Sequence, residues 1–143
     1  MKYKILLIML IPICVFSQNW LKNIDEAKAI ATEKQQPIIL VFSGSDWCAP
    51  CIKLEKQTTN TEAFKNYAAD NYVMLKADFP KRKKNKLSTE QQLHNDKLAE
   101  MYNKNGFFPL IVVLNSSGKT LGNLGYGKYS PENFIEKINS FVK

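Results

Sequence analysis

Two cysteines separated by two residues, Cys48 and Cys51, are the side chains of this sequence best suited to chemistry. They lie in the segment DWCAPC of a chain that contains three cysteines. Thiols at this spacing can ligate a metal, form a structural disulfide, or alternate between dithiol and disulfide in a redox reaction. The surrounding sequence distinguishes these possibilities.

A metal site is the first possibility. A structural zinc ion needs four ligands, usually two cysteine pairs or one pair with histidines. Beyond the N-terminal segment, the chain adds to Cys48 and Cys51 only one imidazole, His94, in the polar helical segment QQLHNDK. We therefore interpret His94 as an exposed helix residue, and the sequence predicts no metal.

A purely structural disulfide is the second possibility. Its loop would be very short, and the entropic stabilisation that a cross-link provides decreases as the loop shortens. An exported protein could still use such a bond, so this alternative stays open.

A redox centre is the third possibility, and it accounts for more of the sequence around the two cysteines. The pair follows an apolar segment and begins a helical pattern, so we expect Cys48 at a helix N-terminus, exposed beside Trp47, where free N–H groups favour a thiolate. Cys51 is expected one turn further in, shielded, where it could attack a mixed disulfide formed at Cys48. Pro50 removes one N–H and stiffens the turn, and Trp47 supplies an apolar wall.

The first seventeen residues have the features of a secretory signal peptide. Lys2 and Lys4 form a basic start, residues 5–16 are apolar apart from Pro12, and a cleavage site fits after Ser17. An apolar run this short does not reach the about 20 residues that span a bilayer. An uncleaved anchor remains the alternative. We expect an exported, periplasmic protein of a bacterium.

Residues 18–143 would then form the mature domain, which is long enough to fold without a disulfide. Cys14 would leave with the signal peptide, and the bulky Ile13 before it does not favour a lipoprotein anchor. The formal charge of +7 would fall to +5 as Lys2 and Lys4 leave. This composition is basic without being typical of nucleic-acid binding, and we expect a monomer.

The pattern of apolar residues predicts an α/β domain. Helices alternate with strands in the order α-β-α-β-α-β-β-α, which predicts a central mixed, mostly parallel sheet with an antiparallel edge, flanked by helices on both faces. The predicted strands are 37–44, 71–78, 109–115 and 120–125. The predicted helices are 23–34, one from Ala49, one capped by Asn60, one capped by Ser88 and ended by Gly106, and one begun by Ser130 and Pro131.

The segment DWCAPC resembles the Trp-Cys-x-Pro-Cys centre of the thioredoxin superfamily. The longer segment QQPIILVFSGSDWCAPCIKLEKQT is similar to the periplasmic C-terminal domain of the membrane electron relay DsbD and to small secreted thioredoxin-like proteins. The resemblance covers nearly all of residues 20–143 and implies a thioredoxin fold.

The resemblance also implies roles for individual residues. Cys48 would be the attacking nucleophile and Cys51 the resolving thiol. Pro109 would follow a cis peptide bond and pack over the disulfide, and Phe108 would present its backbone to a substrate. The implied substrate-binding residues are Trp47, Ala49, Pro50, Phe108, Pro109 and Gly125.

The sequence departs from the family pattern at two positions. Phe42 stands six residues before Cys48, where many thioredoxins have a buried aspartate that assists proton transfer. Water, Glu55 or Lys76 would have to carry that proton, or its transfer would be slower. Glu55 is interpreted more simply as an exposed helix residue. Leu110 follows the predicted cis-proline, where threonine is common, and makes the groove more apolar.

Two further segments have two interpretations each. The basic run Lys81–Lys86 could dock an acidic partner or an anionic membrane surface, or it could be a solvated insertion loop. Tyr126 could flank the substrate groove, or it could pack in the core or within a turn.

We interpret the chain as an exported thiol–disulfide oxidoreductase, most simply a disulfide reductase whose cofactor is its own dithiol. Ala49 and Pro50 offer neither charge nor hydrogen bond to a thiolate, so we expect a potential nearer the about −270 mV of thioredoxin than the about −120 mV of DsbA. The expected partners are protein thiols and disulfides, with a membrane electron relay as donor. The alternatives are an oxidase or isomerase of the same fold, and a redox-silent binding module or chaperone.

Overall fold

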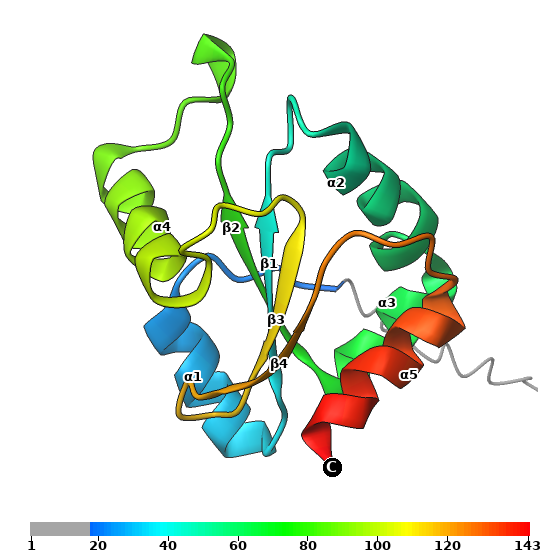
Figure 1. Ribbon diagram of the computed structural model, residues 1–143. Helices are drawn as coiled ribbons and strands as arrows, with labels where there is room; N and C mark the ends of the chain where they lie inside the picture. Colours follow the sequence, from blue (N-terminus) through cyan, green and yellow to red (C-terminus); the bar gives the residue numbers. More distant parts are fainter. Residues whose placement is uncertain (1–17) are drawn as a thin grey trace, which may run out of the picture.

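The computed structural model describes residues 18–143, and the predicted signal peptide lies outside the described residues. A four-stranded sheet runs through the centre of this part of the chain, in the order β2-β1-β3-β4 (Figure 1). The strands are β1 (Ile38–Ser43), β2 (Val73–Asp78), β3 (Leu110–Leu114) and β4 (Thr120–Leu124).

The sheet is mixed, but the prediction that it is mostly parallel is wrong. Of the three strand pairs within residues 18–143, β1–β2 is parallel, whereas β1–β3 and β3–β4 are antiparallel. After β2 and helix α4 (Thr89–Tyr102), residues 103–109 lead the chain back to the end of the sheet where β1 ends. Leu110 therefore pairs with Phe42, and β3 runs in the opposite direction to β1.

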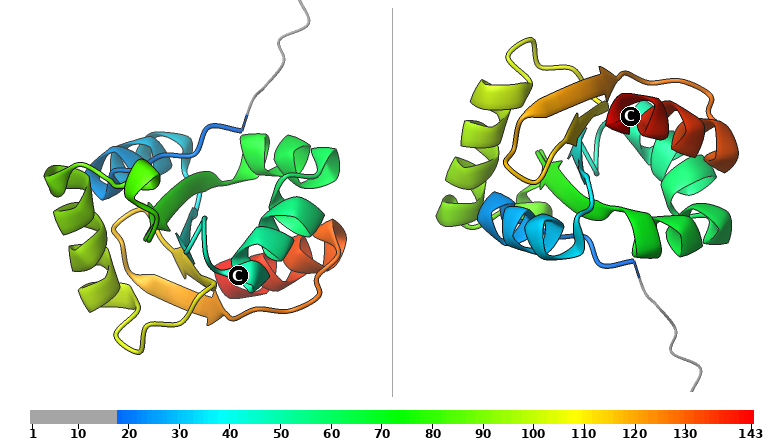
Figure 2. Two further views of the ribbon diagram at one scale, coloured as in Figure 1. Left: turned by 90° about the horizontal axis from the view of Figure 1, so that it is seen from above. Right: turned by 90° about the horizontal axis from the view of Figure 1, so that it is seen from below.

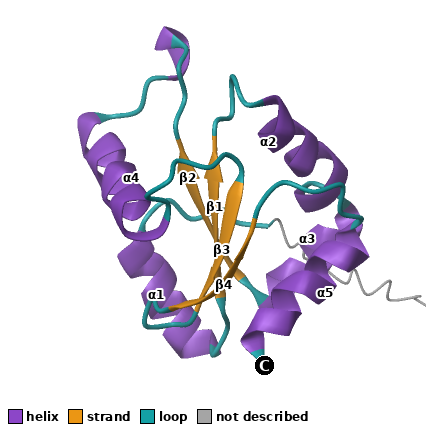
Figure 3. Ribbon diagram, viewed as in Figure 1, coloured by secondary structure: helices purple, strands orange, loops and turns teal. Residues whose placement is uncertain are grey.

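Helices cover both faces of the sheet, as predicted (Figures 2 and 3). Helices α1 (Ile24–Lys34) and α4 pack on one face. The other face carries α2 (Ala49–Leu54), its continuation as a π-helical turn η1 (Glu55–Thr59), α3 (Glu62–Asn71) and α5 (Pro131–Val142). A short 3-10 turn, η2 (Lys83–Asn85), projects between β2 and α4.

Strand β1 is buried along its whole length, as its continuous apolar run predicts. Ile38, Leu40 and Phe42 face the α1/α4 side, whereas Ile39 and Val41 face the side of α3 and α5. The strand is therefore fixed between two apolar layers, and it delivers the residues that follow Ser43 to a defined place.

Capping side chains define where several helices begin. Ser88 accepts a hydrogen bond from the Gln91 N–H and Ser130 from the Asn133 N–H, and both caps were predicted. The predicted cap at Asn60 is wrong. Thr61 caps α3 through the Phe64 N–H, because η1 extends the preceding helix to Thr59.

Helix α4 ends at Tyr102, before the predicted stop at Gly106. Gly106 instead adopts a φ of 66° within the connection to β3, a conformation that glycine adopts without a steric penalty.

The segment before α1 lies along the outer edge of β2. The Leu21 N–H donates to the Met74 carbonyl at 2.9 Å, and the Lys76 N–H donates to the Leu21 carbonyl at 3.0 Å. This short pairing covers part of an edge strand and places Trp20 beside the Lys76 side chain, 4.7 Å from Nζ to the ring centre. No helix within residues 18–143 is long and apolar enough to cross a membrane.

Candidate active site

The two cysteines form a disulfide just beyond the carboxyl end of β1. Their Cα atoms lie 5.3 Å apart. Cys48 is the N-cap of α2, and its Sγ accepts a hydrogen bond from the Cys51 N–H at 3.3 Å. Pro50 lies in the first turn of the helix, where a missing N–H leaves no intrahelical bond unmade. The helix start therefore directs the Cys51 N–H at the Cys48 sulfur, where it favours a thiolate over a thiol.

The predicted difference in exposure between the two cysteines is not present in the disulfide. Cys48 is 4% exposed and Cys51 is 3% exposed. Each sulfur covers part of the other when the two are bonded. The distinction between them is positional, because Cys48 lies at the helix N-terminus and Cys51 one turn inside it.

Trp47 forms one wall of the site and is held from several directions. Its Nε1–H donates to the Phe79 carbonyl at 2.7 Å, and its ring meets the Phe108 ring edge-on with centroids 5.4 Å apart. Gly44 packs beneath the indole, where any Cβ would overlap the ring. The side chain stays 38% exposed, so it offers a fixed apolar surface beside the disulfide.

A second wall of the site is the segment Phe108–Pro109. The bond between these residues is cis, as predicted, and Pro109 lines the same small cavity as Cys51. Phe108 packs against both Trp47 and Phe79, so the two walls touch through aromatic rings.

Sequence reasoning missed the residue that positions this wall. Asn103 is buried, and its side-chain amide donates to the Phe107 carbonyl and accepts from the Phe107 N–H, each at 2.9 Å. Phe107 itself is 58% exposed at the edge of the site. The sequence did not single out Asn103, because the helix was predicted to continue to Gly106. The helix ends at Tyr102 instead, and Asn103, just after it, bonds to the backbone of the following segment.

The remaining predicted substrate-binding residues lie in the active-site turn and beside the start of β3. Ala49 and Pro50 form the turn between the cysteines. Gly125 is exposed with open space around it, and it follows Leu124, which pairs with Ile111. That register places Gly125 beside the start of β3, close to Pro109.

A polar pair lies behind the disulfide. Lys76 Nζ is 3.3 Å from Glu55 Oε1, and both side chains line the small cavity that also reaches Cys51 and Pro109. The cavity volume is about 10 Å³, close to the roughly 10–15 Å³ that one water molecule requires. Phe42 is fully buried and packs on the other face of the sheet, stacked with Phe79. The acidic and basic side chains that share this cavity with Cys51 are therefore Glu55 and Lys76.

The prediction that His94 is an exposed helix residue is wrong. His94 is half-buried, and its Nε2 accepts a hydrogen bond from the Ile24 N–H at 3.1 Å, which ties α4 to the start of α1. Within residues 18–143, no group of three or more His, Cys, Asp or Glu side chains could hold a metal ion.

A disulfide at a helix N-terminus, facing a cis-proline and reached from a buried central strand, defines a thioredoxin-like redox centre. The family model described as thioredoxin-like matches residues 19–116, and the chain belongs to this family. The chain is 33% identical over 132 residues to the disulfide bond reductase DsbH of Chlamydia pneumoniae, which covers 92% of this chain and 77% of that protein.

Solved structures agree with this assignment. A structure of DsbH oxidoreductase superposes with a TM-score of 0.81 at 30% identity, over 98% of this chain and 94% of that one. The oxidised C-terminal domain of DsbD from Neisseria meningitidis has the same fold, with a TM-score of 0.56 at 20% identity over 81% of this chain and 90% of that domain. The protein is thus a thiol–disulfide oxidoreductase related to DsbH, and its redox group is the Cys48–Cys51 disulfide.

Proposed function

We propose that this protein is an exported disulfide reductase that acts on protein disulfides. The observation that carries the proposal is the Cys48–Cys51 disulfide at the start of α2, facing Pro109 and flanked by the exposed ring of Trp47. The relative whose sequence it matches at 33% identity is named a disulfide bond reductase.

The reaction begins from the reduced dithiol. The Cys48 thiolate attacks one sulfur of the substrate disulfide, forms a mixed disulfide, and releases the other substrate sulfur as a thiolate. Cys51 then loses its proton and attacks the Cys48 sulfur, which releases the second substrate thiolate and leaves the Cys48–Cys51 disulfide. Two electrons pass to the substrate, and its two thiolates take up protons.

Glu55 is the group we assign to the second step. Its carboxylate lines the cavity next to Cys51, and a single water in that space could carry the proton between them. Lys76 holds the carboxylate in place through the 3.3 Å contact, and Trp20 covers the ammonium group. These residues replace the buried aspartate of many thioredoxins.

The turn between the cysteines supports the reducing direction of electron flow. Ala49 and Pro50 carry no charged or hydrogen-bonding side chain that would stabilise the reduced thiolate strongly. A weakly stabilised thiolate makes the dithiol reducing, with a potential nearer about −270 mV than about −120 mV. A potential near the second value would instead identify an oxidase or isomerase.

Export is the second part of the proposal. Lys2, Lys4 and the apolar residues 5–16 support a signal peptide that is cleaved after Ser17 and directs the protein to the periplasm. A membrane electron relay would then return two electrons to the Cys48–Cys51 disulfide. Sequencing the N-terminus of the mature protein from a periplasmic fraction tests this; a chain that still begins at Met1 would contradict cleavage.

The reductase activity is tested with insulin and dithiothreitol as donor, together with the equilibrium potential against glutathione. Cys48→Ser should abolish reduction of insulin disulfides, and Cys51→Ser should accumulate a mixed disulfide on Cys48. Activity that survives Cys48→Ser would favour the redox-silent binding module.

A further inference from the structure

The basic loop Lys81–Lys86 is held against the active-site turn. Asp46, two residues before Cys48, accepts hydrogen bonds from the Lys81 N–H at 2.9 Å and the Arg82 N–H at 3.0 Å. The same carboxylate accepts from the Asn85 side chain at 2.9 Å. These bonds, led by the one from the Lys81 backbone, hold the pKa of Asp46 below its ordinary value. The loop therefore has a fixed place relative to the disulfide.

A second contact joins the loop to the wall of the site. The Lys81 ammonium group lies 3.9 Å from the centre of the Trp47 ring, within the range of a cation–π interaction. Trp47 also contacts Phe108, so one continuous surface runs from the basic loop across the indole to the segment before Pro109.

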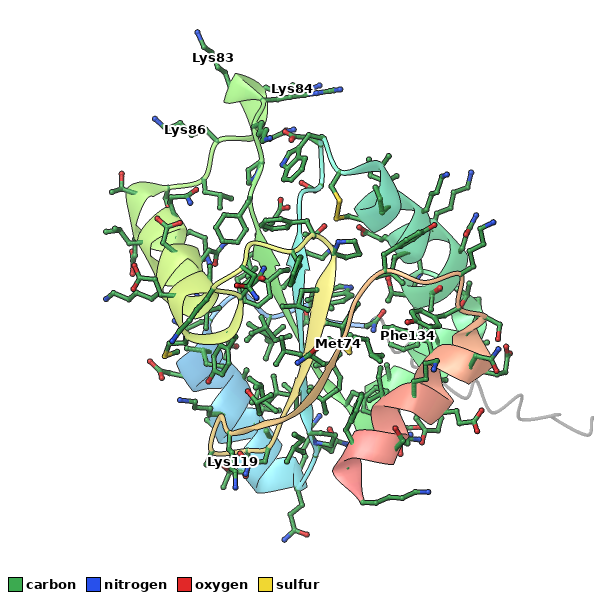
Figure 4. The ribbon with its side chains drawn as sticks, viewed as in Figure 1. Met74, Lys83, Lys84, Lys86, Lys119 and Phe134 are labelled. Carbon is green, nitrogen blue, oxygen red and sulfur yellow. A yellow bond between two sulfur atoms is a disulfide. The ribbon has the colours of Figure 1, made fainter. Side chains whose placement is uncertain are left out.

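The charge of the loop is not neutralised locally. The loop contributes five cationic side chains, against the carboxylates of Asp46 and Asp78 nearby. Each of these cationic residues is exposed, and within residues 18–143 none of them forms an ion pair. Figure 4 shows Lys83, Lys84 and Lys86 projecting from the same end of the molecule as the disulfide, whereas Lys119 lies at the opposite end.

We propose that this loop is a docking surface for an acidic segment of the protein substrate, close to the disulfide that is reduced. The inference rests on the proposed reductase function and specifies its substrates as proteins whose reducible cysteine is flanked by Asp or Glu. The concentrated positive charge of the loop, beside the active site, raises the rate at which the protein encounters such substrates. It also selects their orientation, because the acidic segment lies against the loop while the disulfide lies beside Trp47.

The position of the loop favours a protein substrate over an anionic membrane. A membrane bound by Lys83, Lys84 and Lys86 would press the end that carries the disulfide against lipid headgroups. The surface made by Trp47 and Phe108, which a substrate must reach, would then be obstructed.

The test compares two fluorogenic peptides with one disulfide each, identical except that three glutamates beside one cysteine in the first are glutamines in the second. With dithiothreitol as donor, we expect kcat/KM at low ionic strength to be about tenfold higher for the glutamate peptide. Salt at 0.5 M should remove most of that preference, because exposed charges are then screened within about 4–5 Å.

The loop variant is Lys83→Gln/Lys84→Gln/Lys86→Gln, which leaves Lys81 on Trp47. Its preference for the glutamate peptide should fall to about twofold or less, while its rate with the glutamine peptide stays at the wild-type value. The matched control is Lys34→Gln/Lys119→Gln/Lys143→Gln, which removes the same charge at the other end of the molecule and should keep the preference.

The proposal would be overturned if the preference for the glutamate peptide were equal in the wild type and the loop variant. It would also be overturned if this preference fell equally in the loop variant and the control variant. If the proposed reductase function is itself wrong, the result differs, because neither peptide would then be reduced in a Cys48-dependent way. In that case, a cysteine-free form of the glutamate peptide should still bind and shift the NMR signals of the loop amides, and absence of binding would reject the docking surface.

An experiment with lipid vesicles distinguishes docking of an acidic protein segment from binding to an anionic membrane. We expect no loop-dependent co-sedimentation with vesicles of phosphatidylglycerol and phosphatidylcholine at physiological salt. Loop-dependent sedimentation combined with an unchanged peptide preference would assign the loop to the membrane and overturn the proposal.

Discussion

Lys76 Nζ lies 3.3 Å from Glu55 Oε1, and both side chains line a small cavity that Cys51 also lines. The two residues come from β2 and η1, which are separated in sequence and meet behind the disulfide. The pair is partly exposed, so its contribution to stability is small, about 0–1 kcal/mol. Because the pair lines the cavity next to Cys51, we expect it to act in proton transfer rather than in stabilising the fold.

Glu55→Gln should slow the resolving step. The amide keeps the size and can still contact Lys76, but it cannot accept a proton from Cys51. We expect the rate of disulfide reduction at neutral pH to fall about tenfold or more, the lower end of general-base effects. Stopped-flow tryptophan fluorescence over a range of pH measures this, and the pH–rate profile should change shape.

The control for this variant is Glu62→Gln. Glu62 is also paired with a lysine, Lys65, but its side chain is 83% exposed and it lies on α3, outside the cavity. Equal rates for the wild type and Glu55→Gln at every pH would exclude Glu55 from proton transfer and leave water or Lys76 as the carrier.

Much of this site could be predicted from the sequence, because the relevant signals are local. The spacing of Cys48 and Cys51, the apolar run before them and the resemblance around Pro109 were sufficient to place the disulfide at a helix start facing a cis-proline. Ser88 and Ser130 likewise act on N–H groups three residues away.

The parts that could not be predicted depend on contacts between distant segments. A doubly buried strand is apolar in either direction, so the sequence of β3 does not show that Leu110 pairs with Phe42. Asp46 resembles any exposed turn residue until the fold brings Lys81 and Arg82 to its carboxylate. At Asn60, the local pattern fitted a cap, but the longer helix ending in η1 moved the start of α3 by one residue.

Asp46→Asn should release the basic loop. An amide keeps one acceptor oxygen in place of the two that bond the Lys81 and Arg82 N–H groups and the Asn85 amide. We expect tryptic cleavage after Lys83 or Lys84 to accelerate roughly threefold or more, because local opening exposes the chain. The folded-state pKa of Asp46 is lowered, so in the wild type this protection is present above the ordinary carboxyl range and is lost as pH falls through the folded-state value.

Cleavage is followed by mass spectrometry, with Asp96→Asn on α4 as the control. Identical cleavage rates in Asp46→Asn and the wild type would show that the loop is fixed by other contacts.

Tyr72 should make the protein less stable in alkali. Burial is the main cause that raises its pKa above the usual value, with Tyr67 beside it adding to the effect. The hydroxyl also donates to Asn139 Oδ1 at 2.6 Å, which requires the neutral phenol. The unfolded state ionises first, near about pH 10, so this contribution to stability is complete below that pH and decreases above it.

Each pH unit above that value should lower the free energy of unfolding by up to about 1.4 kcal/mol through this group. Lysines titrate in the same range, so the comparison is with Tyr72→Phe, whose urea denaturation should show a shallower alkaline slope. Parallel slopes in the wild type and the variant would show that Tyr72 does not ionise differently in the two states.

Gly44→Ala should displace the Trp47 ring. Gly44 is buried, and a Cβ there would overlap the indole, which is held by its bond to the Phe79 carbonyl and its contact with Phe108. We expect the free energy of unfolding to fall by about 1–3 kcal/mol, the usual cost of overpacking. Displacement of the indole would also break its contact with the Lys81 ammonium group. We therefore expect the reduction of peptide disulfides to slow as well.

Gly125→Ala is the matched control for stability, because nothing lies near the position where its Cβ would be. Urea denaturation and near-ultraviolet circular dichroism of both variants measure the effect. Trp20 is far from Gly44 in sequence and is not among the atoms that the added Cβ would meet, so a change in the tryptophan signal reports on Trp47. If Gly44→Ala keeps the wild-type tryptophan signal and stability, the indole has room to adjust and Gly44 does not fix the wall of the active site. If the signal changes while the Cys48-dependent rate is preserved, Trp47 shapes the rim without contributing to the reaction of small substrates.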